Sequence, residues 1–304
     1  MTRYRGRFAP SPTGPLHFGS LVAAVGSFLE ARTRGGDWLV RMDDLDPPRV
    51  VPGAADDILR ALQACGMVWD GEVVHQSTRS DAYHSALHRL RAKGLVYPCA
   101  CSRREIADSA IAGVEGPVYP GTCRAGLPPG KAARALRIDT RGGTIAFEDA
   151  LQGRITTALE QEVGDFVLHR YDGVYAYQLA VVVDDAEEGI TDIVRGADLL
   201  GSTSRQIYVQ HLLGLPQPRY AHLPVAVNAA GEKLSKQTLA APLDAAKPLP
   251  ALVAALSFLG QQPPRELARA TIRELWDWAM RNWSLARVPR VATERVPSLP
   301  NDEL

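Results

Sequence analysis

The stretch that decides the fold lies near the beginning of the chain and reads RGRFAPSPTGPLHFGSLVAAVGSFLEARTRGGDWLVRM, residues 5–42. Residues 5–9 form a short β-like run that ends at a turn rich in proline and glycine. Residues 16–34 place apolar side chains at helical spacing, and residues 38–42 have the pattern of a second strand. Strand, loop, helix and strand in this order predict a βαβ unit in a parallel sheet. Its ligand crevice is expected at the carboxyl ends of the strands.

The rest of the chain extends this α/β pattern in four parts. We predict helices at 54–65, 81–93, 202–213, 250–259 and 265–283, strands at 175–183 and 220–227, and an irregular end. Between residue 97 and about residue 160, short segments and frequent glycines replace the helical periodicity, which indicates an inserted subdomain. The predicted parts are a first half of the sheet domain at 1–96, an α+β insertion at 97–165, a second half at 166–240 and a short helical region at 241–304.

The composition is that of an ordinary globular protein. The chain has 304 residues, 46% of them hydrophobic, and its 34 basic side chains balance 34 acidic ones. This balance excludes a uniformly basic coat for nucleic acid and an acidic disordered tail, but it leaves room for a local basic track. We see neither the apolar run of a signal peptide nor a segment long enough to span a bilayer. The expectation is a cytoplasmic monomer without membrane contact.

A first candidate site lies at the junction between the first strand and the first helix. The amino end of a helix offers unpaired N–H groups and partial positive charge, which suit a phosphate. Gly19 allows a planar group to approach the backbone, and His17 can donate a hydrogen bond to a phosphate oxygen. By itself this pattern is more often an ordinary proline-rich turn, because short motifs recur by chance.

A second candidate site lies far along the chain at Lys233-Leu234-Ser235-Lys236, beside Gly231. Two lysines that bracket a serine can form a cationic clamp for a polyphosphate. Alone, this tetrapeptide would be a solvated loop.

Together and in this order, the two motifs resemble the signature sequences of class I aminoacyl-tRNA synthetases. Further blocks are similar to the glutamyl branch: RFAPSPTG at 7–14, RMDDLD at 41–46, YQLAVVVDD at 177–185 and VRGADL at 194–199. The resemblance covers roughly residues 5–260. It implies a Rossmann-like catalytic domain that binds ATP with Mg²⁺ and activates L-glutamate.

The length points to one group within this branch. A full glutamyl-tRNA synthetase has a large helical anticodon-binding region after the lysine loop, whereas 68 residues follow Lys236 here. The chain therefore resembles the truncated paralogues that lack an anticodon-binding domain. In that family, glutamate is activated without tRNA and is attached to the queuosine base of tRNA(Asp). The implied partners are ATP, L-glutamate and tRNA(Asp) that carries queuosine.

The resemblance also assigns roles to single residues. It implies that His17 and Lys236 are catalytic, and that ATP is bound by His17, Gly19, Ser20, Lys233 and Lys236. The glutamate pocket would comprise Arg7, Phe8, Ala9, Pro10, Ser11, Asp43, Tyr177 and Arg195. A planar arginine fork suits a carboxylate, so Arg195 is expected to pair with the substrate. Asp43 stands where the family usually has glutamate, and the alternative role for it is a turn cap.

The insertion contains three of the four cysteines of the chain. Cys99 and Cys101 form a Cys-x-Cys pair that cannot easily close a disulfide, and Cys123 follows. Three thiolates can hold one tetrahedral ion. The truncated family has the same Cys-x-Cys…Tyr-x₃-Cys pattern with zinc bound, which implies Tyr119 as the fourth ligand and one structural Zn²⁺ per chain. Three free thiols beside a buried tyrosine are the alternative.

Three other functions compete with glutamyl transfer to queuosine. A small-molecule nucleotidylyltransferase would share the fold, but it usually has His-x-Gly-His, and Ser20 occupies the last position here. A non-catalytic module derived from a synthetase would not need His17, Arg195 and Lys236. Conventional charging of a tRNA 3′ end is disfavoured by the short C-terminal region.

Overall fold

The predicted βαβ unit is present in the computed structural model, which describes residues 3–109, 112–113, 116–228, 231 and 242–296. Strand β1 (Arg5–Phe8) leads through a loop into helix α1 (Phe18–Thr33) and strand β2 (Asp37–Met42). β1 and β2 pair in parallel, and β2 pairs in parallel with the short β3 (Val74–His75). The sequence prediction for this segment is confirmed.

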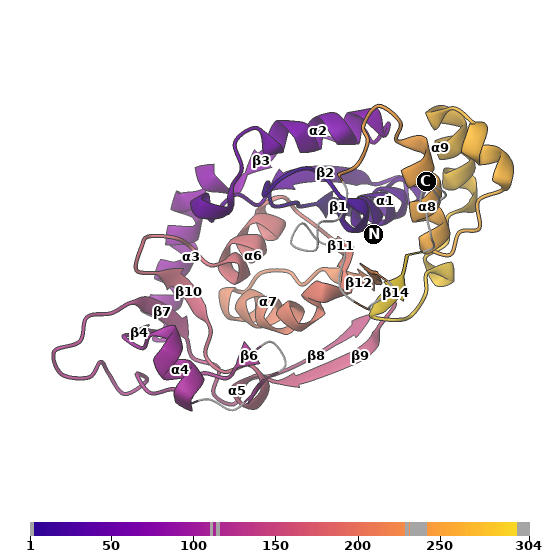
Figure 1. Ribbon diagram of the computed structural model, residues 1–304. Helices are drawn as coiled ribbons and strands as arrows, with labels where there is room; N and C mark the ends of the chain where they lie inside the picture. Colours follow the sequence, from indigo (N-terminus) through magenta and orange to yellow (C-terminus); the bar gives the residue numbers. More distant parts are fainter. Residues whose placement is uncertain (1–2, 110–111, 114–115, 229–230, 232–241, 297–304) are drawn as a thin grey trace.

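The second half of the sheet consists of β11 (Asp192–Gly196) and β12 (Arg219–Leu223), which pair in parallel and are joined by α7 (Leu200–Leu213). β1 and β11 lie side by side, and the Thr191 N–H donates to the Arg5 carbonyl at 2.9 Å. The two halves therefore meet at β1 and β11 (Figure 1). At such a meeting point a ligand crevice forms beyond the carboxyl ends of the strands.

Helices cover the sheet and the amino-terminal unit. These are α2 (Ala54–Ala64), α3 (Ser80–Ala92), α6 (Tyr177–Glu187), α8 (Leu249–Phe258) and α9 (Ile272–Asn282). α1 packs against α8 and α9, and this contact contains much of the largest apolar core. Trp276 donates to the Cys65 carbonyl at 2.7 Å and Trp283 to Glu30 at 2.7 Å, so these two tryptophans attach the C-terminal region to the amino-terminal unit.

The region between the two halves contributes an antiparallel sheet and a β-hairpin. β4 (Val96–Cys99), β7 (Ala135–Ile138) and β10 (Val167–Arg170) form an antiparallel sheet in the order β10-β7-β4. β8 (Thr144–Asp149) and β9 (Gly153–Ala158) form a hairpin that meets β12 through the pair Tyr220↔Asp149. The hairpin therefore extends the parallel sheet of the second half (Figure 1).

Shorter elements complete the described chain. They are α4 (Arg103–Ser109), β5 (Ala112–Gly113), β6 (Gly116–Pro117), α5 (Leu159–Glu162), β13 (Val225–Val227) and β14 (Thr293–Arg295). Turns of 3-10 helix occur at Pro47–Arg49, Gln76–Thr78, Ala197–Leu199, Arg265–Arg269 and Leu285–Arg287. Among the described residues, we find no helix with the length and apolar character needed to cross a membrane.

Several predictions of secondary structure were wrong. Residues 175–183, expected as a strand, contain the start of helix α6, in which Leu179–Val183 are all buried. A helix that is buried on every side has no polar face, so its sequence lacks the helical spacing of apolar residues. The run of valines therefore predicts a strand. The helix expected at 265–283 is a 3-10 turn followed by α9, and the end expected to be irregular contains β14, which pairs with β13. The strand expected at 220–227 breaks at Pro224.

Candidate active site

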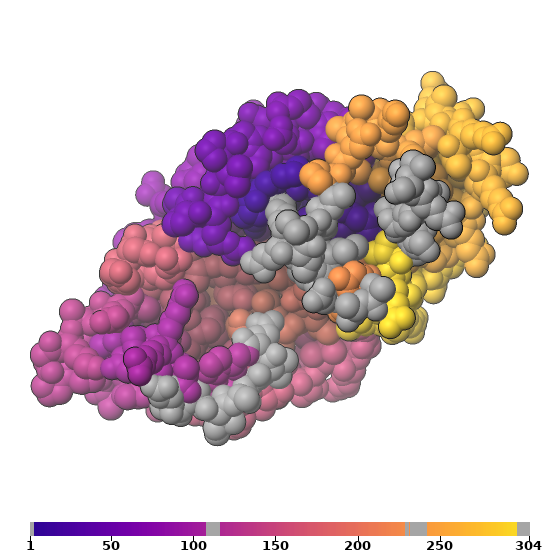
Figure 2. Space-filling view, viewed as in Figure 1, coloured from indigo at the N-terminus to yellow at the C-terminus, as the bar shows by residue number. Residues whose placement is uncertain are grey.

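The amino end of α1 is closed by a reciprocal cap. The His17 Nδ1 accepts from the Ser20 N–H at 3.4 Å, and the Ser20 hydroxyl accepts from the His17 N–H at 2.9 Å. Because Nδ1 is an acceptor, the ring proton lies on Nε2. This cap fixes the histidine at a helix end that suits a phosphate. In the space-filling view, the surface of the N-terminal segment is recessed between the purple segments above it and the salmon and orange ones below (Figure 2).

The loop between β1 and α1 lies against the end of β2. The Asp43 N–H donates to the Pro10 carbonyl at 3.0 Å, which brings the ends of the two strands together. The Phe8 ring is buried and stacks on Trp38 with 6.3 Å between centroids. Phe8 can therefore reach a ligand only through its backbone, whereas Ser11 is exposed.

A buried cluster of charged side chains joins β1 and β2 to α6. Arg7 donates to the Asp185 carboxylate from both Nε (3.0 Å) and Nη2 (3.2 Å). Arg41 donates to Asp185 at 2.8 Å and to Glu188 at 2.6 Å. Burial opposes ionisation of Asp185, but Arg7 and Arg41 together hold its pKa below the usual range. The Arg7 guanidinium, predicted to contact glutamate, thus already has a carboxylate partner.

Asp43, which follows β2, belongs to the same cluster, and its side chain is buried. Its Oδ1 accepts from the Arg41 Nε at 2.9 Å. Burial raises the pKa of Asp43 to about 6, although Arg41 works in the opposite direction. Asp43 therefore changes charge close to neutral pH. A carboxylate at this place can bind an ammonium group of a ligand when it is ionised.

Helix α6 is anchored on its other side by Asp184. This carboxylate is fully buried and accepts from Gln76 at 2.7 Å, from Tyr83 at 2.8 Å and from Arg79 at 2.6 Å. These bonds hold α6 against α3 and the turn before it. The first residue of α6 is Tyr177, so the same anchors set the position of that ring.

Arg195, near the end of β11, is buried and surrounded by neutral partners. Its Nη2 donates to the Thr203 hydroxyl at 2.7 Å and to the Gln206 amide oxygen at 2.8 Å. Its Nε donates to the His222 Nε2 at 3.1 Å, and its Nη1 has a longer contact of 3.5 Å with the Tyr177 hydroxyl. Within the described part of the chain, no carboxylate forms an ion pair with this guanidinium. A buried guanidinium in this setting can accept the carboxylate of a ligand as its counter-ion.

His222 and Asp149 lie behind Arg195. His222, on β12, faces Asp149 at the end of β8, with 2.6 Å between Nδ1 and Oδ2, and both side chains are fully buried. The sequence pattern identifies neither His222 nor Asp149 as a site residue. The predicted start of the helix at residue 202 was wrong by two residues, because α7 begins at Leu200, and Thr203 within it contacts Arg195.

The predicted lysine motif, Lys233 and Lys236, lies outside the described residues. The chain that follows it is described again from Pro242, which forms an antiparallel bridge with His17. The Leu243 N–H donates to the Leu16 carbonyl at 2.8 Å. The chain that is described again from Pro242, six residues after Lys236, therefore lies against the amino end of α1.

The predicted metal ligands of the insertion lie together. The sulfur atoms of Cys99, Cys101 and Cys123 lie within 4.8 Å of one another, and the last two are 3.7 Å apart. Tetrahedral coordination with Zn–S bonds of about 2.3 Å requires sulfur atoms about 3.8 Å apart. The Tyr119 hydroxyl lies 3.3 Å from the Cys99 sulfur and 3.7 Å from the Cys101 sulfur. This donor set fits one zinc ion.

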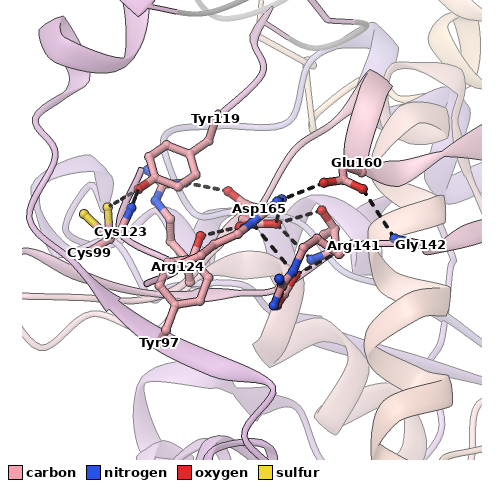
Figure 3. A network of polar contacts seen from close by, with 12 residues as sticks. Tyr97, Cys99, Tyr119, Cys123, Arg124, Arg141, Gly142, Glu160 and Asp165 are labelled. Atoms are coloured by element: carbon pink, nitrogen blue, oxygen red, sulfur yellow. Dashed lines mark hydrogen bonds and ion pairs between the residues drawn. The ribbon is translucent and has the colours of Figure 1, made fainter. Parts of the chain in front are cut away.

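An ion-pair network lies beside the cysteine cluster, which comprises Cys99, Cys101 and Cys123 (Figure 3). Arg124, the residue after Cys123, forms a two-point contact with Asp165 at 2.6 and 2.9 Å. The Tyr97 hydroxyl donates to the same carboxylate, and Arg124 also reaches Glu160 at 2.8 Å. Arginine and hydroxyl donors keep the pKa of Asp165 low although burial opposes this. The network fixes the backbone that carries Cys123.

The comparisons with known proteins first define the class. Residues 3–248 match the family described as tRNA synthetases class I (E and Q), catalytic domain, and the chain belongs to this family. Its fold class, a Rossmann-like class I catalytic domain with a parallel sheet, is confirmed.

Individual relatives show which members of this family the chain is similar to. A glutamyl-Q tRNA(Asp) synthetase of Aromatoleum aromaticum is 63% identical over 97% of this chain and 93% of its own length. The protein of the same name from Dechloromonas aromatica is 61% identical over 97% of this chain and 99% of its own length. Among solved structures, a glutamate tRNA ligase of Elizabethkingia meningosepticum shares the fold with a TM-score of 0.79 at 24% identity, over 98% of this chain and 68% of that one.

Proposed function

We propose that this enzyme activates L-glutamate with ATP and transfers it to the queuosine base of tRNA(Asp). The near full-length relatives with the name glutamyl-Q tRNA(Asp) synthetase support this reading. The observation that carries it is the placement of two charged side chains. A buried guanidinium surrounded by neutral partners, Arg195, and an acidic group, Asp43, lie at the ends of β11 and β2, the strands on either side of β1.

In this proposal the pocket recognises both ends of glutamate. Arg195, with Tyr177 beside it, pairs with the side-chain carboxylate. Ionised Asp43 attracts the α-ammonium group, and the backbone of residues 8–11 lines the space between them. Arg7 acts through Asp185, because its guanidinium already contacts that carboxylate. The α-carboxylate then faces the nucleotide.

The first step joins glutamate to AMP. The α-carboxylate attacks the α-phosphorus of ATP, and pyrophosphate leaves with its Mg²⁺. His17 Nε2 and the first N–H groups of α1, near Gly19 and Ser20, bind phosphate oxygens. Lys236, supported by Lys233, would stabilise the charge of the transition state. Little covalent chemistry is needed from the protein, so position and charge account for the rate.

The second step transfers glutamate to RNA. A hydroxyl group of the queuosine ring attacks the activated carbonyl, and AMP leaves. Zinc held by Cys99, Cys101, Tyr119 and Cys123 would be structural, because four protein ligands leave no open position. The metal would fix the insertion that faces the RNA.

A cavity beside the cysteine cluster is lined by side chains of the kinds that bind RNA. Its volume is about 780 Å³, and its lining includes Arg104, Lys131, Arg134 and Tyr171. Tyr171 is 78% exposed, and its backbone N–H donates to the Arg134 carbonyl at 2.8 Å. Cationic and aromatic side chains together suit phosphate binding and base stacking.

Transfer of labelled glutamate tests the proposal. We expect label on tRNA(Asp) that contains queuosine, none on tRNA(Asp) that lacks it, and retention of the label after removal of the 3′-terminal adenosine. Arg134→Ala should slow transfer without changing activation, whereas Arg91→Ala, an exposed arginine on α3, should change neither. Label at the 3′ end of tRNA(Glu) would instead show conventional charging.

A further inference from the structure

The side chain of Asp149 divides its two oxygens between different partners. Oδ1 accepts from three backbone N–H groups, those of Leu151 at 3.0 Å, Gln152 at 2.9 Å and His222 at 3.2 Å. Oδ2 faces the His222 Nδ1 at 2.6 Å. Because three backbone donors converge on Oδ1, this carboxylate has one orientation.

The position of the proton on His222 follows from its neighbours. The Arg195 Nε always carries a proton and lies 3.1 Å from His222 Nε2, so Nε2 must accept. The single proton of the neutral ring is therefore on Nδ1 and is donated to Asp149. Burial, together with the nearby Arg195 charge, lowers the pKa of His222 to about 4, so the ring is neutral at pH 7.

We propose that Asp149 and His222 are positioning residues for glutamate: the carboxylate fixes the His222 tautomer, and the ring then fixes the orientation of the Arg195 guanidinium. This inference rests on the proposed function, because it assigns Arg195 to the substrate carboxylate. Thr203 and Gln206 hold Nη2, and His222 holds Nε. Nη1 is then the nitrogen with the longest contact, 3.5 Å to Tyr177.

The arrangement links two parts of the chain. Asp149 is the last residue of β8, and this strand belongs to the hairpin between the halves of the sheet. The hydrogen bonds that its carboxylate accepts from His222 tie the hairpin to β12, next to the strand that carries Arg195. The glutamate pocket thus depends on a residue outside the signature motifs.

Asp149→Asn tests the tautomer with almost no change in shape. The amide oxygen must stay on the three backbone donors, so the amide NH₂ must face His222 Nδ1. The ring then has to carry its proton on Nε2, where it opposes the Arg195 Nε–H. We expect the KM for glutamate to rise about tenfold to hundredfold, with the KM for ATP unchanged.

Two variants of the histidine form a matched pair. His222→Gln can place an acceptor near the Nε2 position, so it keeps a partner for Arg195. His222→Asn can place a donor near the Nδ1 position, so it keeps only the contact with Asp149. If the ring orients the guanidinium, the KM for glutamate rises more in His222→Asn than in His222→Gln. Equal effects in the two variants would indicate core packing and overturn the proposal.

The measurements are glutamate-dependent exchange of pyrophosphate into ATP and ¹⁵N NMR of histidine-labelled protein. The ring signal that is lost in His222→Gln is that of His222. This signal should show the ring proton on Nδ1 in the wild type and on Nε2 in Asp149→Asn. Asp192→Asn, which removes a charge from the Arg219 pair at the opposite end of β11, should match the wild type in both assays. If Asp149→Asn does not fold, the comparison of His222→Gln with His222→Asn tests the proposal.

The outcomes separate the two proposals. A folded Asp149→Asn with the wild-type KM for glutamate, or with equal rises in both KM values, overturns the positioning role. A wild-type Nε2–H signal overturns it as well. A wild type that shows the Nδ1–H signal but no glutamate-dependent exchange refutes the proposed function and, with it, the substrate assigned to Arg195.

Discussion

At the scale of single residues, Asp43 is the position where the chain departs from the pattern of its family. It is one methylene shorter than the glutamate that the resemblance leads us to expect. Its backbone N–H bonds to Pro10 and its Oδ1 to the buried Arg41, so both backbone and side chain are held at the end of β2. In the contacts of the described residues, the Asp43 side chain bonds to Arg41 and does not cap a turn.

Binding of glutamate should depend on pH through Asp43. Burial raises the pKa of this carboxyl group to about 6, so it is ionised at pH 7.5 and largely protonated at pH 5. Loss of the charge removes the attraction for the α-ammonium group. We expect the KM for glutamate in pyrophosphate exchange to be about tenfold higher at pH 5 than at pH 7.5.

Asp43→Asn provides the comparison. Its KM for glutamate should be high at both pH values and should vary little between them, because the amide does not titrate. The KM for ATP serves as the internal control. A wild-type KM for glutamate that stays constant from pH 7.5 to pH 5 would remove Asp43 from ammonium binding.

Among the elements, α1 and α9 begin with the same reciprocal cap. Ser20 closes the cap of α1 with His17, and Glu274 closes that of α9 with Thr271. Loss of such a cap costs about 1 kcal/mol of folding free energy. Ser20→Ala and Thr271→Ala should therefore lower stability to a similar degree, as measured by urea unfolding.

The two caps should differ in their effect on activity. Ser20→Ala removes the hydroxyl that accepts from the His17 backbone N–H and so loosens the backbone that carries this histidine; the KM for ATP should therefore rise. Thr271→Ala should leave exchange kinetics unchanged, because α9 packs on the outer side of α1. Equal kinetics in both variants would show that the cap of α1 has only a structural role.

The cysteine cluster leads us to predict the metal content of the protein. Purified protein should contain about one zinc per chain, and Cys123→Ser should lose it. Tyr119→Phe should weaken zinc binding in a chelator competition, while Cys65→Ala, outside the cluster, should not. Full zinc affinity in Tyr119→Phe would reduce the protein ligands to the three thiolates.

The elements that were predicted well are those with a one-sided apolar pattern. α2 and α3 have such a pattern and begin and end within a residue of the prediction. α6 does not, because Leu179–Val183 are buried on all sides and a run of valines favours a strand. Asp149 and His222 left no signal in the sequence, since 73 positions separate them and only the pairing of β8 with β12 brings them together.

For the whole molecule, the account depends on two distant stretches, the first helix and the chain around the lysine motif. The His17–Pro242 bridge brings the chain after the lysine motif to the first helix, and the contact of β1 with β11 brings Arg195 to the same side as Asp43. That the lysine motif itself reaches this place stays a prediction, because it lies outside the described residues. The side-chain partners of Arg7 and Arg195 could not be predicted, because they come from α6, α7 and β12.

The most direct test is exchange of labelled pyrophosphate into ATP by the purified wild-type enzyme in the absence of tRNA. The account predicts exchange with L-glutamate and a loss of about two orders of magnitude in Lys236→Ala. No exchange with any amino acid, or exchange only after tRNA is added, would contradict it.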